Sequence, residues 1–137
     1  KGRINDLLQF IVTEIKEFEE DYALKSWKDY KEDRKLQKLM DRTVENILTA
    51  LIEICGVLLT RQEVALDSYA QVLGECAKKL NFSEEEQEIL AKIAIQRNRL
   101  AHRYLNFRWQ SINMFIKNKE LIIRLLNKIA ETIKNSG

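Results

Sequence analysis

The chain has 137 residues, which is enough for one domain with a buried core. It contains no proline and only four glycines, and this scarcity favours long helices because proline breaks helices and glycine weakens them. The formal net charge is +2, which is too small to indicate nucleic-acid or membrane binding through bulk charge. Any such function must come from local clustering of charged side chains.

Hydrophobic residues make up 45% of the chain and charged residues 32%, a balance typical of a globular protein. No apolar run is long enough to span a membrane and no leader segment is visible, so we expect a cytoplasmic protein. The two cysteines, Cys55 and Cys76, lie in apolar helical patterns without CxxC spacing. We expect buried, reduced thiols at these positions, and neither a zinc site nor a disulfide.

The first half of the chain predicts two long helices. Apolar residues recur at spacings of three and four over about residues 4–22 and again over about 34–59. The second stripe is wide, so this helix should lie centrally with neighbours on several sides. The charged segment 24–33 between them is a helix tail, a bend or a loop, and Trp27 and Tyr30 in it favour a solvated face with two aromatic anchors over a nucleic-acid site.

The second half predicts three more helices after a connection over residues 60–67. Ser68 with Gln71 resembles a capping box that opens a short third helix, which ends at residues 81–82. Ser83 with Glu86 is a clearer capping box, and the fourth helix that it opens is expected to continue to about residue 104. A fifth helix is expected over about residues 109–133.

These elements predict an all-α fold, an up-down bundle of four long helices and one short helix. No repeat, low-complexity tract or interdomain linker interrupts the pattern. We therefore expect a single helical domain over residues 1–137.

The end of the fourth expected helix carries the most chemistry in the chain. Its sequence is Arg97-Asn98-Arg99-Leu100-Ala101-His102-Arg103-Tyr104, and it contains the chain's only histidine. Residues 97–108 include four arginines and no carboxylate. On a helix Asn98 and His102 are four residues apart and share a face, while Arg97 and Tyr104 belong to an adjoining stripe.

These side chains suit the cleavage of RNA through its own 2′-hydroxyl. Histidine can give or take a proton near neutral pH, so His102 would move the proton. Arg97 would stabilise the charged phosphorane, and no metal or other cofactor is required. The reaction benefits from both a base and an acid, but each chain has one histidine. We therefore predict a homodimer whose composite site joins Arg97, Asn98 and His102 from both subunits.

A plainer interpretation stands beside this one. A single histidine near a helix end is usually a cap or a surface residue, and cations suit the negative end of the helix dipole. The protein would then be a purely structural helical dimer whose arginines cap the fourth helix.

The motif Arg97-x4-His102-x-Tyr104, with Asn98 directly after the arginine, resembles the R-x4-H-x-Y signature of the HepT-like branch of the HEPN superfamily. The order of long helices from about Leu7 to Ile133 is also similar. One departure is Leu66-Asp67 before the third helix, where the family often has a proline. This departure concerns loop geometry and not the motif.

The resemblance implies an all-α dimer that acts as a metal-independent endoribonuclease, the toxin half of a type VII toxin–antitoxin pair. Arg97 and His102 would be the catalytic pair and Asn98 a polar helper, with Arg99 and Arg103 supporting RNA binding. Tyr104 matches the tyrosine that a minimal nucleotidyltransferase antitoxin, MntA, modifies with AMP. The alternative is a non-catalytic nucleotide-binding or substrate-binding partner subunit of that transferase.

Overall fold

The computed structural model describes residues 2–59 and 68–136, and within these ranges it confirms the predicted all-α fold. The helices there are α1 (Gly2–Asp21), α2 (Trp27–Glu32), α3 (Arg34–Leu58), α4 (Tyr69–Lys79), α5 (Glu84–Arg99), α6 (Leu105–Lys117) and α7 (Lys119–Ser136). The first two expected long helices are confirmed as α1 and α3. The expected connection 60–67 lies outside the described residues.

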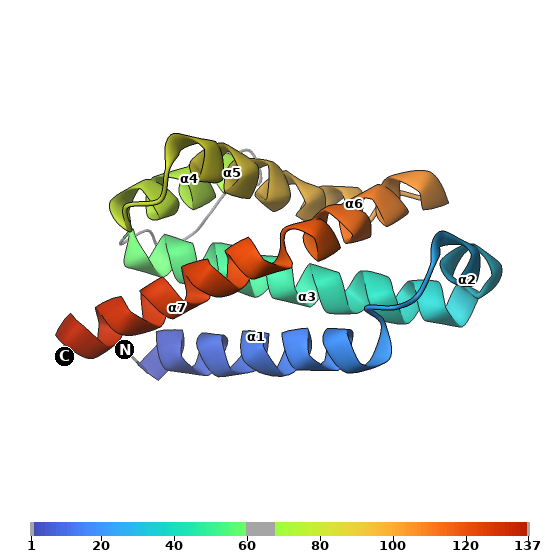
Figure 1. Cartoon of the computed structure of the whole chain (residues 1–137), viewed down its shortest axis with the longest axis horizontal. Helices are drawn as coiled ribbons and strands as arrows, with labels where there is room; N and C mark the ends of the chain where they lie inside the picture. Colours follow the sequence, from blue (N-terminus) through green and yellow to red (C-terminus); the bar gives the residue numbers. More distant parts are fainter. Residues whose placement is uncertain (1, 60–67, 137) are drawn as a thin grey trace.

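The central position predicted for the second long helix is confirmed, because α3 packs against α1, α2, α4, α5 and α6. Figure 1 shows α1 along one side of α3, with α4 beside α5 on the other side. The short helix α2 lies at the end of the bundle where α5 gives way to α6. This end is where the motif of residues 97–104 is placed.

The charged segment 24–33 contains the helix α2, which was not predicted from the sequence. Ser26 Oγ accepts the N–H of Asp29 at 3.1 Å, and the Asp29 carboxylate accepts the N–H of Ser26 at 2.9 Å. Asp33 then caps α3 by accepting the N–H of Leu36 at 3.0 Å. The anchoring role predicted for Tyr30 is confirmed, because its side chain is fully buried.

The two predicted capping boxes have different outcomes. Ser68 precedes α4, but its side chain makes no cap hydrogen bond, and the Gln71 amide donates instead to Glu75 at 2.9 Å. The Ser83–Glu86 box is confirmed, with hydrogen bonds of 3.1 and 2.9 Å between side chains and backbone N–H groups.

The helix ends in the second half differ from the expected ones in two places. The fourth expected helix stops at Arg99 instead of continuing to about residue 104. The fifth expected helix begins earlier, at Leu105, and is divided into α6 and α7 at Asn118. The Asn118 side-chain amide donates to the carbonyl of Met114 at 2.9 Å, a local bond that competes with a continuous helix.

Both cysteines lie in the core as free thiols, as predicted. The neighbouring thiol of Cys76 on α4, together with burial, raises the pKa of Cys55 on α3. Among the described residues, no helix is long and apolar enough to cross a membrane.

Candidate functional site

The motif spans the end of one helix and the start of the next. After Arg99 the side chain of Leu100 is buried in the core, and residues 101–104 form a turn before α6. Tyr104 is the N-cap residue of α6. The prediction that Asn98 and His102 share one helix face is wrong, because His102 lies beyond the last helical residue of α5.

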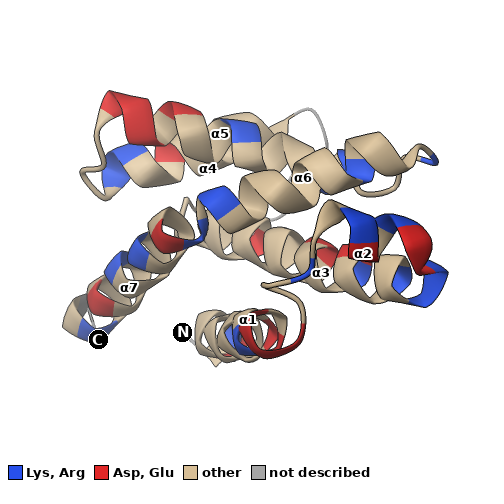
Figure 2. Cartoon of the chain, turned by 45° about the vertical axis from the view of Figure 1, so that its right-hand side comes forward, with Lys and Arg blue, Asp and Glu red and all other residues tan. Residues whose placement is uncertain are grey.

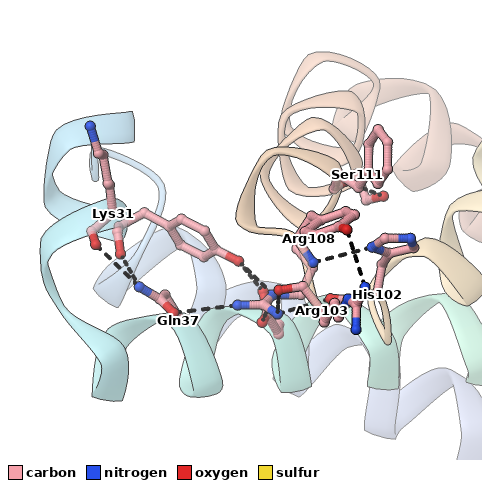
Figure 3. A network of polar contacts seen from close by, with 10 residues as sticks. Lys31, Gln37, His102, Arg103, Arg108 and Ser111 are labelled. Atoms are coloured by element: carbon pink, nitrogen blue, oxygen red, sulfur yellow. Dashed lines mark hydrogen bonds and ion pairs between the residues drawn. The ribbon is translucent and has the colours of Figure 1, made fainter.

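The side chain of Arg108, from the start of α6, stabilises this non-helical segment through hydrogen bonds to its backbone. Arg108 Nη1 donates to the carbonyl of His102 at 2.8 Å and to the carbonyl of Arg103 at 3.2 Å. Figure 3 shows the guanidinium beside these two residues. Because both carbonyls are satisfied by a side chain, the backbone does not need to continue the helix in order to pair them.

Arg108 is itself anchored on α3 and α2 by three side chains, which together with it we call the Arg108 network (Figure 3). Its Nε forms an ion pair with Asp41 Oδ2 at 3.0 Å, and its Nη2 donates to Gln37 Oε1 at 3.3 Å. The Tyr30 hydroxyl donates to Asp41 Oδ1 at 2.7 Å. The Gln37 amide also donates to the carbonyl of Tyr30 at 2.9 Å, so the network joins α2, α3 and the motif turn.

The network is largely shielded from water. The side chains of Arg108 and Asp41 are 17% and 18% exposed. Burial raises the pKa of Asp41, against the hydrogen bond from Tyr30 and the positive charge of Arg108, which lower it. Burial also raises the pKa of Tyr30 far above its usual range, so its hydroxyl stays protonated and donates.

His102 is exposed and packs in a small aromatic cluster with Tyr104 and Phe107. Its ring centroid lies 5.0 Å from that of Tyr104 and 4.7 Å from that of Phe107. His102 Nδ1 accepts the backbone N–H of Tyr104 at 3.1 Å. The neutral ring therefore carries its hydrogen on Nε2, which is directed away from this bond and can donate to a ligand.

Two arginines of the motif flank this aromatic cluster. The Arg103 guanidinium lies 5.1 Å from the ring centroid of Tyr104, and its Nη2 donates to the Tyr104 hydroxyl at 3.2 Å. The Arg99 guanidinium lies 5.7 Å from the ring centroid of Phe107. Figure 2 shows acidic residues gathered at the start of α5 and cations further along it. Tyr104 is 53% exposed, and its hydroxyl lies beside the Arg103 cation.

Arg97 has partners on the central helix. Its Nε donates to Thr49 Oγ1 at 3.2 Å, and its Nη2 forms an ion pair with Glu45 Oε2 at 3.4 Å. All three residues line a groove of about 430 Å³ that also touches α1. Within the described part of one chain no hydrogen bond or ring contact joins Arg97 to His102, and the Asn98 side chain is exposed. Contact within a single chain therefore does not assemble the predicted catalytic pair.

The residues that shape this site were not predicted from the sequence. Arg108 is one of the four arginines of residues 97–108, but its three partners lie far from it in the chain, so the sequence does not indicate its role. The sequence does contain one indication of this network. Asp41 directly follows Met40 of the apolar stripe on the central helix, and a carboxylate buried there would need a cationic or hydrogen-bonding partner. Among residues 2–59 and 68–136 no group of three His, Cys, Asp or Glu side chains could hold a metal ion.

Comparison with known families agrees with the resemblance carried by the motif. A family model described as Ribonuclease HepT-like matches residues 11–133, a range that includes the whole motif and the Arg108 network. No curated protein sequence matches the chain. Since the match covers most of the chain, the protein belongs to the HepT-like ribonuclease family.

Proposed function

We propose that this protein is a metal-independent endoribonuclease toxin that acts in the cytoplasm as a homodimer. Arg97 and His102 of both copies form its active site, with Asn98 as a polar helper. The observation that carries the proposal is the exposed His102 ring, held in a basic turn without carboxylates within a chain of a ribonuclease family.

The reaction needs only groups that the motif supplies. A base takes the proton of the RNA 2′-hydroxyl, and this oxygen attacks the adjacent phosphorus. The bond from phosphorus to the 5′-oxygen breaks, and an acid gives that oxygen a proton. The products are a 2′,3′-cyclic phosphate and a 5′-hydroxyl. A guanidinium stabilises the extra negative charge on the phosphorane between these steps.

The need for two proton-transfer groups supports a site built from two copies. One imidazole cannot take the proton of the 2′-hydroxyl and protonate the 5′-oxygen in the same step, so His102 of a second copy supplies the other role. The ring that acts as base must release the Tyr104 N–H from Nδ1, because it needs a free lone pair to accept the proton. Arg97 uses some of its five donors on Thr49 and Glu45, and the remaining donors are available for phosphate.

We further propose that a nucleotidyltransferase antitoxin of the MntA type controls the toxin by transferring AMP to Tyr104, as in type VII systems. The Tyr104 oxygen would attack the α-phosphorus of ATP and release pyrophosphate. The exposure of Tyr104 and the position of its hydroxyl beside Arg103 support this assignment. The added phosphate would lie next to His102 and Arg103, where it would exclude RNA by bulk and neutralise the cation.

The decisive test is RNA cleavage by the purified protein in the presence of a chelator. Cleavage should persist in the wild type and be lost in His102→Ala and Arg97→Ala, with Arg124→Ala as an arginine control outside the motif. Activity that survives His102→Ala would exclude the proposed chemistry. For the regulation, Tyr104→Phe should keep cleavage and lose AMP transfer, whereas Tyr69→Phe should keep both.

A second candidate is a non-catalytic, nucleotide-binding partner subunit of the transferase. The ion pair between Arg97 and Glu45 favours it, because it commits part of the guanidinium within the chain. This candidate predicts a stable complex with the transferase and no RNA cleavage at any protein concentration. The same cleavage assay therefore separates the two functions.

A further inference from the structure

We propose that a groove between α5 and α6, which we call the α6 groove, binds the single-stranded RNA that flanks the scissile phosphate. This inference rests on the proposed ribonuclease function and names where its substrate lies. The groove has a volume of about 590 Å³. Its lining includes two cations and several side-chain amides but no carboxylate.

The two cations of the α6 groove, Arg99 and Lys117, are free to bind phosphate. Neither has a carboxylate partner among the described residues, in contrast to Arg97 and Arg108, which are both held by ion pairs. Phosphate contacts from unpaired cations supply most of the sequence-independent affinity of proteins for nucleic acid. A second groove, near Phe82, also has cations, but it contains the carboxylate of Glu131 and suits an RNA strand less well.

The amides of the groove fall into two groups. Asn118 and Gln96 are committed within the protein, because Asn118 donates to the Met114 carbonyl and Gln96 accepts from Ser111 at 2.9 Å. Gln110 and Asn113 are exposed and have no such bonds.

Gln110, Asn113 and Lys117 recur at spacings of three and four, so they lie on one face of α6. Each free amide offers both a donor and an acceptor, which is what the edge of a nucleobase requires. The face therefore combines contacts for bases with a contact for phosphate.

The groove is continuous with the motif turn through an aromatic platform. Arg99 lines the groove and also lies over the Phe107 ring, which in turn contacts His102. Phe107 and Tyr104 are 38% and 53% exposed. Exposed aromatic rings beside cations favour stacking of unpaired bases, whereas a duplex hides its base faces. From Phe107 to Lys117 the path along α6 is about 15 Å long, at about 1.5 Å per residue.

The test measures the binding of a fluorescent single-stranded RNA in the cleavage-deficient His102→Ala background. Lys117→Ala should weaken binding. It should also reduce the magnitude of the slope of log K against log salt concentration by about 0.7, which is the value for one phosphate contact on a single strand. The double variant Gln110→Ala and Asn113→Ala should weaken binding about two- to tenfold per lost hydrogen bond. Lys128→Ala is the matched control, an exposed lysine of the groove near Phe82, and should leave both quantities unchanged.

Kinetic measurements with His102 intact give a second readout. Lys117→Ala should raise KM and leave kcat unchanged, because the groove holds RNA away from the reacting atoms. A duplex of the same sequence should bind more weakly than the single strand.

The groove assignment is overturned if Lys117→Ala and Lys128→Ala behave alike, or if duplex and single strand bind equally. It is also overturned if the groove variants change the oligomeric mass by light scattering, because the face would then be a contact between copies. The two proposals fail separately. If RNA binding depends on Lys117 but the wild type does not cleave RNA, the ribonuclease proposal is refuted and the groove proposal stands. If the wild type cleaves RNA and Lys117→Ala changes neither binding nor cleavage, the groove proposal is refuted and the ribonuclease proposal stands.

Discussion

Replacement of Arg108 should impair catalysis although Arg108 does not lie among the residues proposed to touch RNA. Its guanidinium links the carbonyls of His102 and Arg103 to Asp41 on α3. Without it the turn loses the contact that places the His102 ring. We expect Arg108→Lys to lower kcat about 10- to 100-fold with little change in KM, because a misplacement of about 1 Å costs that much.

The effect on stability follows from the burial of the ion pair. Removing one partner of a buried pair costs about 3–5 kcal/mol, because the other charge is left without compensation. The side chains of Arg108 and Asp41 are still 17% and 18% exposed to solvent. This partial solvation reduces the expected cost of Arg108→Met to about 2–4 kcal/mol. Lysine preserves the charge but cannot span both carbonyls and Asp41, so Arg108→Lys should cost about 1–2 kcal/mol.

The assay combines urea unfolding, RNA cleavage and nitrogen NMR of the imidazole. In the wild type the chemical shift of His102 Nδ1 should be that of an unprotonated nitrogen that accepts a hydrogen bond. In Arg108→Lys this shift should change as the turn relaxes and the hydrogen bond weakens. The NMR readout does not depend on whether the protein cleaves RNA. Arg124→Met is the control, because its ion pair with Glu86 is 60% exposed on the arginine side and should contribute little to stability.

Two results would refute this reasoning. The first is a folded Arg108→Lys variant with the kcat and the His102 signature of the wild type. The second is an Arg108→Met variant that loses stability but keeps its activity per folded molecule. Either result would show that the His102 ring is held without Arg108.

Three further predictions concern other parts of the fold. The N–H of Ser83 lowers the pKa of Glu86, so the stability that Glu86 has over Glu86→Gln should be present above pH 4.5 and lost as pH falls through the lowered pKa, as measured by thermal unfolding across pH. Cys55 and Cys76 should resist a thiol reagent in the native protein and react only on unfolding; labelling without denaturant would contradict their burial. Asn81 has a φ of 67°, so Asn81→Ala should cost about 1 kcal/mol in urea unfolding while Asn81→Gly should not.

The class of fold and the positions of the main helices could be predicted from the pattern of residues along the chain. The spacing of apolar residues over α1 and α3 is a local property that tertiary contacts reinforce, so it could be predicted. The same holds for the cap at Ser83, whose partner Glu86 is three residues away. The motif from Arg97 to Tyr104 was also visible, because its residue types and spacing are written in the sequence.

The end of α5 and the position of His102 depend on contacts between residues that are distant in the chain. Residues 97–108 contain neither glycine nor proline, so no local signal stops the helix at Arg99. The stop depends on Arg108, whose bonds to the turn are maintained by Asp41 and Gln37, more than sixty residues earlier in the chain. Such long-range pairing leaves no periodic pattern in the sequence. The prediction that the motif is helical as far as Tyr104 was therefore wrong. The motif residues themselves were chosen by their type and spacing, which do not depend on where the helix ends.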